Sequence, residues 1–236
     1  MIKPHSVPLV YAHERAAGAL WCRGGIALLR QSLEGKFIVS AAHVWRGLVA
    51  HRDQLRGRMS IFIGLAPKVV SLLEAEPISI DDDLDIVILR APPKTDALLG
   101  KKAFYQTLTW RQVPAADGET LGVLGFPGEI CRSQQFTVEM ESFYYENTCA
   151  VSSRGTNLLI GAFAAEPPVT VVHVDHPVSA IMDFGGLSGA PAFALRDGKP
   201  VWVGVVKQGA ADKGISAGLQ ATLCHYVRAD GTLQPM

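Results

Sequence analysis

A histidine, an aspartate and a serine stand in local sequences that suit acyl-transfer chemistry. His43 follows an apolar run at 37–42 that ends in two alanines, and small residues there let other segments approach the ring. Asp85 precedes the wholly apolar run 86–89. Ser188 lies in the sequence Gly-Gly-Leu-Ser-Gly-Ala-Pro. Glycines around a serine permit a sharp turn that exposes its hydroxyl and frees backbone N–H groups for an oxyanion.

Each of these segments also has an ordinary structural interpretation. His43 could be a histidine at the end of a strand, and Asp85 could belong to a solvated acidic loop with Asp81, Asp82 and Asp83. The serine segment could be a glycine-rich loop. The combination is more specific, because a histidine can deprotonate a serine hydroxyl while a carboxylate orients the imidazole.

Together the three segments resemble the chymotrypsin-like (trypsin-like) serine protease family. The resemblance rests on Ala-Ala-His at 41–43, Asp-Ile at 85–86 and Gly-x-Ser-Gly-x-Pro at 186–191, in the family's order of His, Asp and Ser. Segments 118–128 and 201–206 are similar to the opening strand of the second barrel and to the strand along the substrate cleft. The resemblance covers about residues 19–227.

The resemblance implies a role for each residue of the triad. His43 would act as general base and then general acid, Asp85 would fix the imidazole tautomer, and Ser188 would form an acyl-enzyme. The backbone N–H groups of Gly186 and Ser188 would form the oxyanion hole. The expected partner is a polypeptide substrate, and a regulatory protein partner is left open.

Several residues depart from the digestive members of the family. Leu187 replaces the aspartate that receives a freshly cut N-terminus, so we expect activity without N-terminal cleavage. Val44 replaces a common cysteine, and Ala190 replaces a glycine. Val206 stands where a serine often supports the aspartate, so support for Asp85 must come from elsewhere or be weaker. The pattern is closer to bacterial stand-alone or HtrA-like protease domains, here expected without a PDZ domain.

The specificity pocket is predicted from the loop that precedes Ser188. Alignment places Met182 at its base, which favours an apolar P1 residue, whereas a shift of one residue would place Asp183 there and favour Arg or Lys. The opposite wall is expected at 206–210. The predicted substrate-binding residues are Met182, Asp183, Val206, Lys207, Gly209 and Gly214.

Short apolar runs separated by Gly, Pro, Asp and Asn predict an all-β fold. We expect two antiparallel six-stranded β-barrels, with domains at 1–105 and 106–236 and a linker over 91–117. Residues 196–199 predict a hairpin turn, and 221–228 predict a short C-terminal helix. The expected strands are 19–29, 36–41, 59–65, 68–73, 85–90, 120–124, 135–141, 158–163, 169–174, 190–195 and 200–206.

Composition narrows the function classes. The 236 residues carry 22 basic and 22 acidic side chains, so no global field favours nucleic acid or an anionic membrane. The sequence shows no secretory signal and no membrane-spanning run, which predicts a cytoplasmic protein with four free cysteine thiols. No cofactor and no metal site are predicted. The main rivals to a protease are an idle binding module on the same fold and an unrelated β-sandwich.

Overall fold

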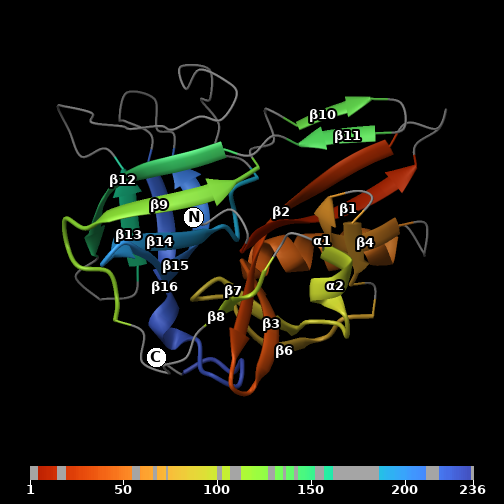
Figure 1. Cartoon of the computed structure of the whole chain (residues 1–236). Helices are drawn as coiled ribbons and strands as arrows, with labels where there is room; N and C mark the ends of the chain where they lie inside the picture. Colours follow the sequence, from red (N-terminus) through yellow and green to blue (C-terminus); the bar gives the residue numbers. More distant parts are fainter. Residues whose placement is uncertain are drawn as a thin grey trace.

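Two β-sheets make up most of the described residues in a computed structural model (Figure 1). The first sheet is formed before residue 107 and the second after residue 119. The structure describes residues 5–14, 20–54, 59–65, 68–72, 74–99, 103–106, 113–126, 131–134, 137–140, 143–151, 157–161, 186–210 and 218–234.

The first sheet runs in the order β5-β4-β1-β2-β3-β7-β6, and β8 pairs in parallel with β2. It therefore has eight strands among the described residues, whereas the sequence predicts six. The N-terminal strand β1, which pairs with both β2 and β4, accounts for part of the difference. The strands are β1 (Ser6–Glu14), β2 (Leu20–Ser32), β3 (Gly35–Ser40), β4 (Met59–Leu65), β5 (Lys68–Ser71), β6 (Pro77–Asp81), β7 (Ile86–Arg90) and β8 (Tyr105–Gln106).

The second sheet closes into a six-stranded barrel in the order β12-β13-β16-β15-β14-β9, as expected. Its predicted hairpin at 196–199 is confirmed, because Asp197 and Gly198 both have positive φ (50° and 71°) between β14 and β15. A separate hairpin, β10–β11, contacts β2. The strands are β9 (Thr120–Gly125), β10 (Cys131–Gln134), β11 (Thr137–Met140), β12 (Phe143–Val151), β13 (Asn157–Gly161), β14 (Pro191–Arg196), β15 (Lys199–Ala210) and β16 (Gly218–Leu223). The expected strand at 169–174 lies outside the described residues.

Strand β7 is apolar on both faces because each face meets a different core. Val87 and Leu89 pack in the core of the first sheet. Ile86 and Ile88 pack in a second cluster that contains Phe193 from the other barrel. Side chains alternate between the faces of a strand, so the absence of a polar face is the sign of burial on both sides. The residue before β7, Asp85, is thereby placed between the two barrels.

The helices differ from the sequence predictions. Helix α1 (Ala42–Gln54) and the short α2 (Thr95–Leu99) were not expected, and α2 and β8 lie inside the segment predicted to be a linker. At the C-terminus, Ala221–Leu223 belong to β16, and only the 3-10 turn η3 (Cys224–Tyr226) follows. Pairing of β16 with both β13 and β15 explains why this segment is extended rather than helical.

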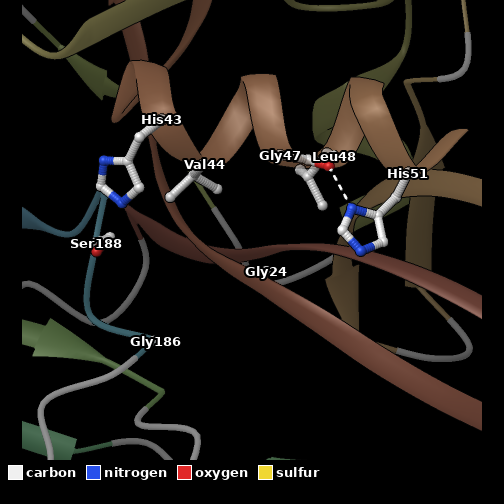
Figure 2. A pocket seen from close by; sticks show the side chains of 8 residues that line it. All are labelled: Gly24, His43, Val44, Gly47, Leu48, His51, Gly186 and Ser188. Carbon is white, nitrogen blue, oxygen red and sulfur yellow. Dashed lines mark hydrogen bonds between the residues drawn. The ribbon is translucent and has the colours of Figure 1, made fainter. Parts of the chain in front are cut away.

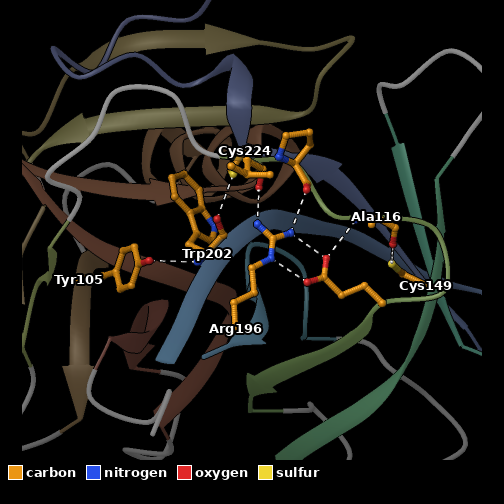
Figure 3. Close-up of polar contacts among 9 residues, drawn as sticks. Tyr105, Ala116, Cys149, Arg196, Trp202 and Cys224 are labelled. Atoms are coloured by element: carbon orange, nitrogen blue, oxygen red, sulfur yellow. Dashed lines mark hydrogen bonds and ion pairs between the residues drawn. The ribbon is translucent and has the colours of Figure 1, made fainter. Parts of the chain in front are cut away.

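An ion pair fixes the segment before β9 to the second barrel (Figure 3). Arg196 donates to both carboxylate oxygens of Glu119 at 2.7 Å and to the carbonyls of Val113 and Pro114. These hydrogen bonds hold the pKa of Glu119 below its ordinary value. Tyr105, on β8, also contacts the second barrel, because its hydroxyl accepts a hydrogen bond from the Trp202 amide on β15.

Cys149 and Cys224 are free and buried, which agrees with the prediction for these two thiols. Burial raises the pKa of both, so neither is a reactive thiolate near neutral pH. The side chains of Cys22 and Cys131 lie outside the described part of the structure, and their state stays a prediction. Within the described residues, no helix is long and apolar enough to cross a membrane.

Candidate active site

Asp85 and His43 are joined by two hydrogen bonds. The imidazole Nδ1 donates to Oδ2 of Asp85 at 2.7 Å, and the backbone N–H of His43 donates to Oδ1 at 2.9 Å. The carboxylate is 17% exposed, whereas the histidine side chain is 52% exposed. The acid is therefore sheltered and the far side of the imidazole is open to a ligand.

Asp85 also caps helix α1. The first amides of an α-helix have no partner within the helix. Here the Asp85 carbonyl accepts from Ala42 N at 3.2 Å, and its carboxylate accepts from His43 N. A negative charge at a helix N-terminus is favourable. One residue thus fixes both the helix that carries the imidazole and the orientation of the ring.

A tight turn presents Ser188. Ala190 N donates to Leu187 O at 2.9 Å, and Gly189 has a φ of 86°, a conformation that favours glycine. A Cβ at Gly189 would lie 2.1 Å from the Ile26 carbonyl oxygen, so side chains are excluded there. Ile26 N donates to Ser188 O at 2.8 Å. The serine turn of the second barrel is therefore fastened directly to β2 of the first.

Leu187 anchors the same turn by hydrophobic contact. It is fully buried in the core cluster of the second barrel, which also contains Ile26. A Cβ on Gly125 would lie 2.3 Å from Leu187 Cδ2, so the leucine side chain packs directly over that glycine. Apolar packing therefore holds the turn at Leu187, the residue that replaces the aspartate of the digestive members of the family.

His43 and Ser188 line one cleft of about 380 Å³ (Figure 2). Figure 2 shows Ser188 beside the imidazole of His43, and the cleft continues along α1. The Ser188 hydroxyl donates to the Lys207 carbonyl at 3.0 Å. Among the described residues it makes no hydrogen bond with His43. The cleft is lined by Gly24, His43, Val44, Gly47, Leu48, His51, Gly186 and Ser188.

Gly186 and Ser188, whose amides are the predicted oxyanion donors, both line this cleft. Gly186 has a φ of 93°, which a residue with a side chain rarely adopts. Within the described part of the chain, neither amide donates to a carbonyl or a side chain.

The predicted pocket residues have different outcomes. The side chain of Val206 is fully buried in the core of the second barrel, and the place of Val206 in the pocket wall stays a prediction. The Lys207 ammonium donates to the Asp83 carbonyl at 3.2 Å, which turns it toward the acidic turn before β7. Gly209 pairs with Leu219 between β15 and β16. Met182, Asp183 and Gly214 lie outside the described residues.

Sequence reasoning missed the wall of the cleft on α1. Gly47 and His51 follow His43 at intervals of four residues, which places all three on one face of a helix. His51 Nδ1 donates to the Gly47 carbonyl at 2.9 Å. That spacing is visible in the sequence, but it has meaning only once the segment is known to be helical.

Comparison with known proteins identifies the architecture. No family model matches the chain, and no curated protein matches it in sequence. The serine protease domain of the Sesbania mosaic virus polyprotein is similar in structure, with a TM-score of 0.52 at 16% identity over 97% of this chain and 94% of that one. The thermostable serine protease AL20 from an extremophilic microorganism has a TM-score of 0.52 at 12% identity over 93% and 91%. The chain therefore has the two-barrel fold of the chymotrypsin-like serine proteases.

Proposed function

We propose that this protein is a serine endopeptidase with His43, Asp85 and Ser188 as its catalytic triad. The observation that carries the proposal is the hydrogen bond from His43 Nδ1 to Asp85, beside a serine that lines the same cleft. This bond fixes the imidazole tautomer, which leaves Nε2 unprotonated and able to accept a proton.

The chemistry follows from these positions. Ser188 Oγ attacks the scissile carbonyl carbon while its proton passes to His43 Nε2. The resulting imidazolium is stabilised by Asp85 and then protonates the leaving amine, which gives an acyl-enzyme. Water then attacks the acyl carbonyl and gives its proton to His43, which returns a proton to Ser188 Oγ as the ester bond breaks. This step releases the carboxylic acid product and restores the enzyme. Before attack, the serine hydroxyl must turn from the Lys207 carbonyl toward His43, and hydrogen bonds of this kind often tighten only with substrate bound.

The oxyanion is assigned to the amides of Gly186 and Ser188. Both residues line the cleft and neither N–H has an acceptor among the described residues. Paired N–H donors that are aimed at a developing negative charge lower the barrier of acyl transfer, and losing one costs about 10²–10³ in kcat.

The alternative is a binding module that keeps the fold without the reaction. The Ser188 hydroxyl bonded to Lys207 favours it, because a serine held by a carbonyl is not activated. The two functions differ in what happens to a bound polypeptide, which is cleaved in one case and released intact in the other.

Replacing the nucleophile tests the proposal. We expect the wild-type protein to cleave an unfolded substrate such as casein, and Ser188→Ala to lower the rate by about 10⁶-fold, because the acyl-enzyme cannot form. Ser71→Ala, at an exposed serine at the end of β5, is the matched control and should cleave at the wild-type rate. Equal cleavage by Ser188→Ala would exclude Ser188 as nucleophile, and binding without cleavage by the wild type would favour the module.

A finer placement belongs to the same proposal. Leu187 supports membership of the bacterial stand-alone or HtrA-like branch, because its apolar anchoring needs no ion pair to a new N-terminus. A cytoplasmic location stays a prediction from the sequence.

A further inference from the structure

Lys207 contacts both halves of the candidate active site. Its backbone carbonyl accepts the Ser188 hydroxyl at 3.0 Å, and its ammonium donates to the Asp83 carbonyl at 3.2 Å. It follows the fully buried Val206 on β15 and is itself half-buried. A residue of the second barrel is thus hydrogen-bonded to the turn of the first sheet that carries Asp85.

That turn needs support, because Asp85 has a φ of 54°. A residue other than glycine keeps a left-handed backbone only where its surroundings hold it there. The second barrel makes two hydrogen bonds to the residues just before Asp85. Thr222 Oγ1 donates to the Leu84 carbonyl at 2.5 Å, and Lys207 Nζ donates to the Asp83 carbonyl. The barrel that carries the serine also fastens the turn that carries the acid.

The turn is strongly acidic. Asp82 forms an exposed ion pair with Arg46 at 2.6 Å. Burial of the Lys207 ammonium lowers its pKa, and the carboxylates of Asp85, Asp81 and Asp83 raise it by less, so the net pKa lies below the ordinary 10.5. The Lys207 ammonium therefore lies near these carboxylates although its burial removes part of its hydration.

We propose that Lys207 is a positioning residue for Asp85, not a wall of the specificity pocket. Its ammonium holds the Asp83 carbonyl and opposes the charge of the turn, so that Asp85 keeps both of its hydrogen bonds to His43. Lys207 would thus give Asp85 the support that a serine often provides in the family and that Val206, at the corresponding position, cannot provide. The inference rests on the proposed serine protease function.

Lys207→Met tests the role directly. A small fluorophosphonate reacts with an activated serine and carries no peptide side chain, so its labelling rate reports activation and not pocket binding. We expect Lys207→Met to label about tenfold more slowly, the effect of losing one charged hydrogen bond. Lys36→Met, which removes a surface ion pair with Asp96, should match the wild type in labelling.

Lys207→Arg and a pH profile separate positioning from simple packing. Arginine keeps its charge at alkaline pH, so Lys207→Arg should restore most of the rate. Because the pKa of Lys207 is lowered, its charge is lost below the ordinary 10.5, and wild-type labelling should decline as pH rises through that range. The charged groups that act on this ammonium are Asp81, Asp83 and Asp85. All three are common to both proteins, so a more alkaline limit in Lys207→Arg belongs to residue 207.

Three results would overturn the inference: equal labelling by Lys207→Met and wild type, no recovery with Lys207→Arg, or coincident alkaline limits in wild type and Lys207→Arg. If Lys207→Met fails to fold, the comparison of Lys207→Arg with wild type decides alone. A wild-type protein that does not label at all contradicts the proposed function instead, so the two failures are distinguishable.

Discussion

Asp85→Asn is expected to slow the acylation of Ser188 by about 10⁴-fold, with little change in folding. The reason lies in the two hydrogen bonds of the carboxylate. The backbone N–H of His43 requires an acceptor and will bind the asparagine oxygen. The amide NH₂ then faces Nδ1 of the imidazole, where only an unprotonated nitrogen can accept it. The ring proton moves to Nε2, which can no longer take the proton of Ser188.

The measurement is the second-order rate constant of fluorophosphonate labelling. Asp82→Asn is a matched control, because it is the same substitution in the same turn, at a side chain that is 64% exposed and pairs with Arg46. We expect it to label within about twofold of wild type, as surface ion pairs contribute little. An Asp85→Asn protein that labels as fast as Asp82→Asn would remove Asp85 from the mechanism.

Leu187→Asp is expected to destabilise the protein and abolish labelling. Leu187 is fully buried in an apolar core, so the new carboxylate would have no partner there. An uncompensated buried charge costs about 3–5 kcal/mol. For a chain of this size that lowers the melting temperature by roughly 10 °C. The turn that presents Ser188 would separate from the core, and the serine would lose its alignment with His43.

Leu195→Asp provides the matched control. Leu195 is a leucine on β14 that is 70% exposed, so its replacement by aspartate should leave stability within about 0.5 kcal/mol of wild type. Thermal denaturation and labelling rate are measured on both variants. A Leu187→Asp protein with wild-type stability and labelling would show that the turn does not depend on apolar anchoring.

The sequence predicted the strands that carry the strongest local signals. β3, β7 and the β14–β15 hairpin are apolar runs bounded by turn residues, and these patterns do not depend on distant contacts. Helix α1 could not be found in the same way. Its N-terminus is preceded by Ala41, which cannot cap a helix, and the cap comes from Asp85, far away in the chain. A helix that is capped by tertiary structure leaves no local signal.

The candidate site shows the same division. Motifs and their order select His43, Asp85 and Ser188 as the proposed triad, and the structure joins His43 to Asp85 by a hydrogen bond. The directions of the side chains on the predicted wall could not be read from the sequence, because alignment cannot tell which side of β15 faces the core. A strand exposes alternate side chains, so the inward direction of Val206 and the turn of Lys207 toward Asp83 required the register of the barrel.

The most direct test of the account is the site of fluorophosphonate attachment in the wild-type protein. Intact mass followed by peptide mapping should show a single adduct on Ser188, formed quickly and absent from His43→Ala, since the hydroxyl is nucleophilic only when the imidazole accepts its proton. No adduct under conditions in which a known serine protease labels fully, or an adduct elsewhere that persists in Ser188→Ala, would contradict the assignment of this cleft as a serine protease active site.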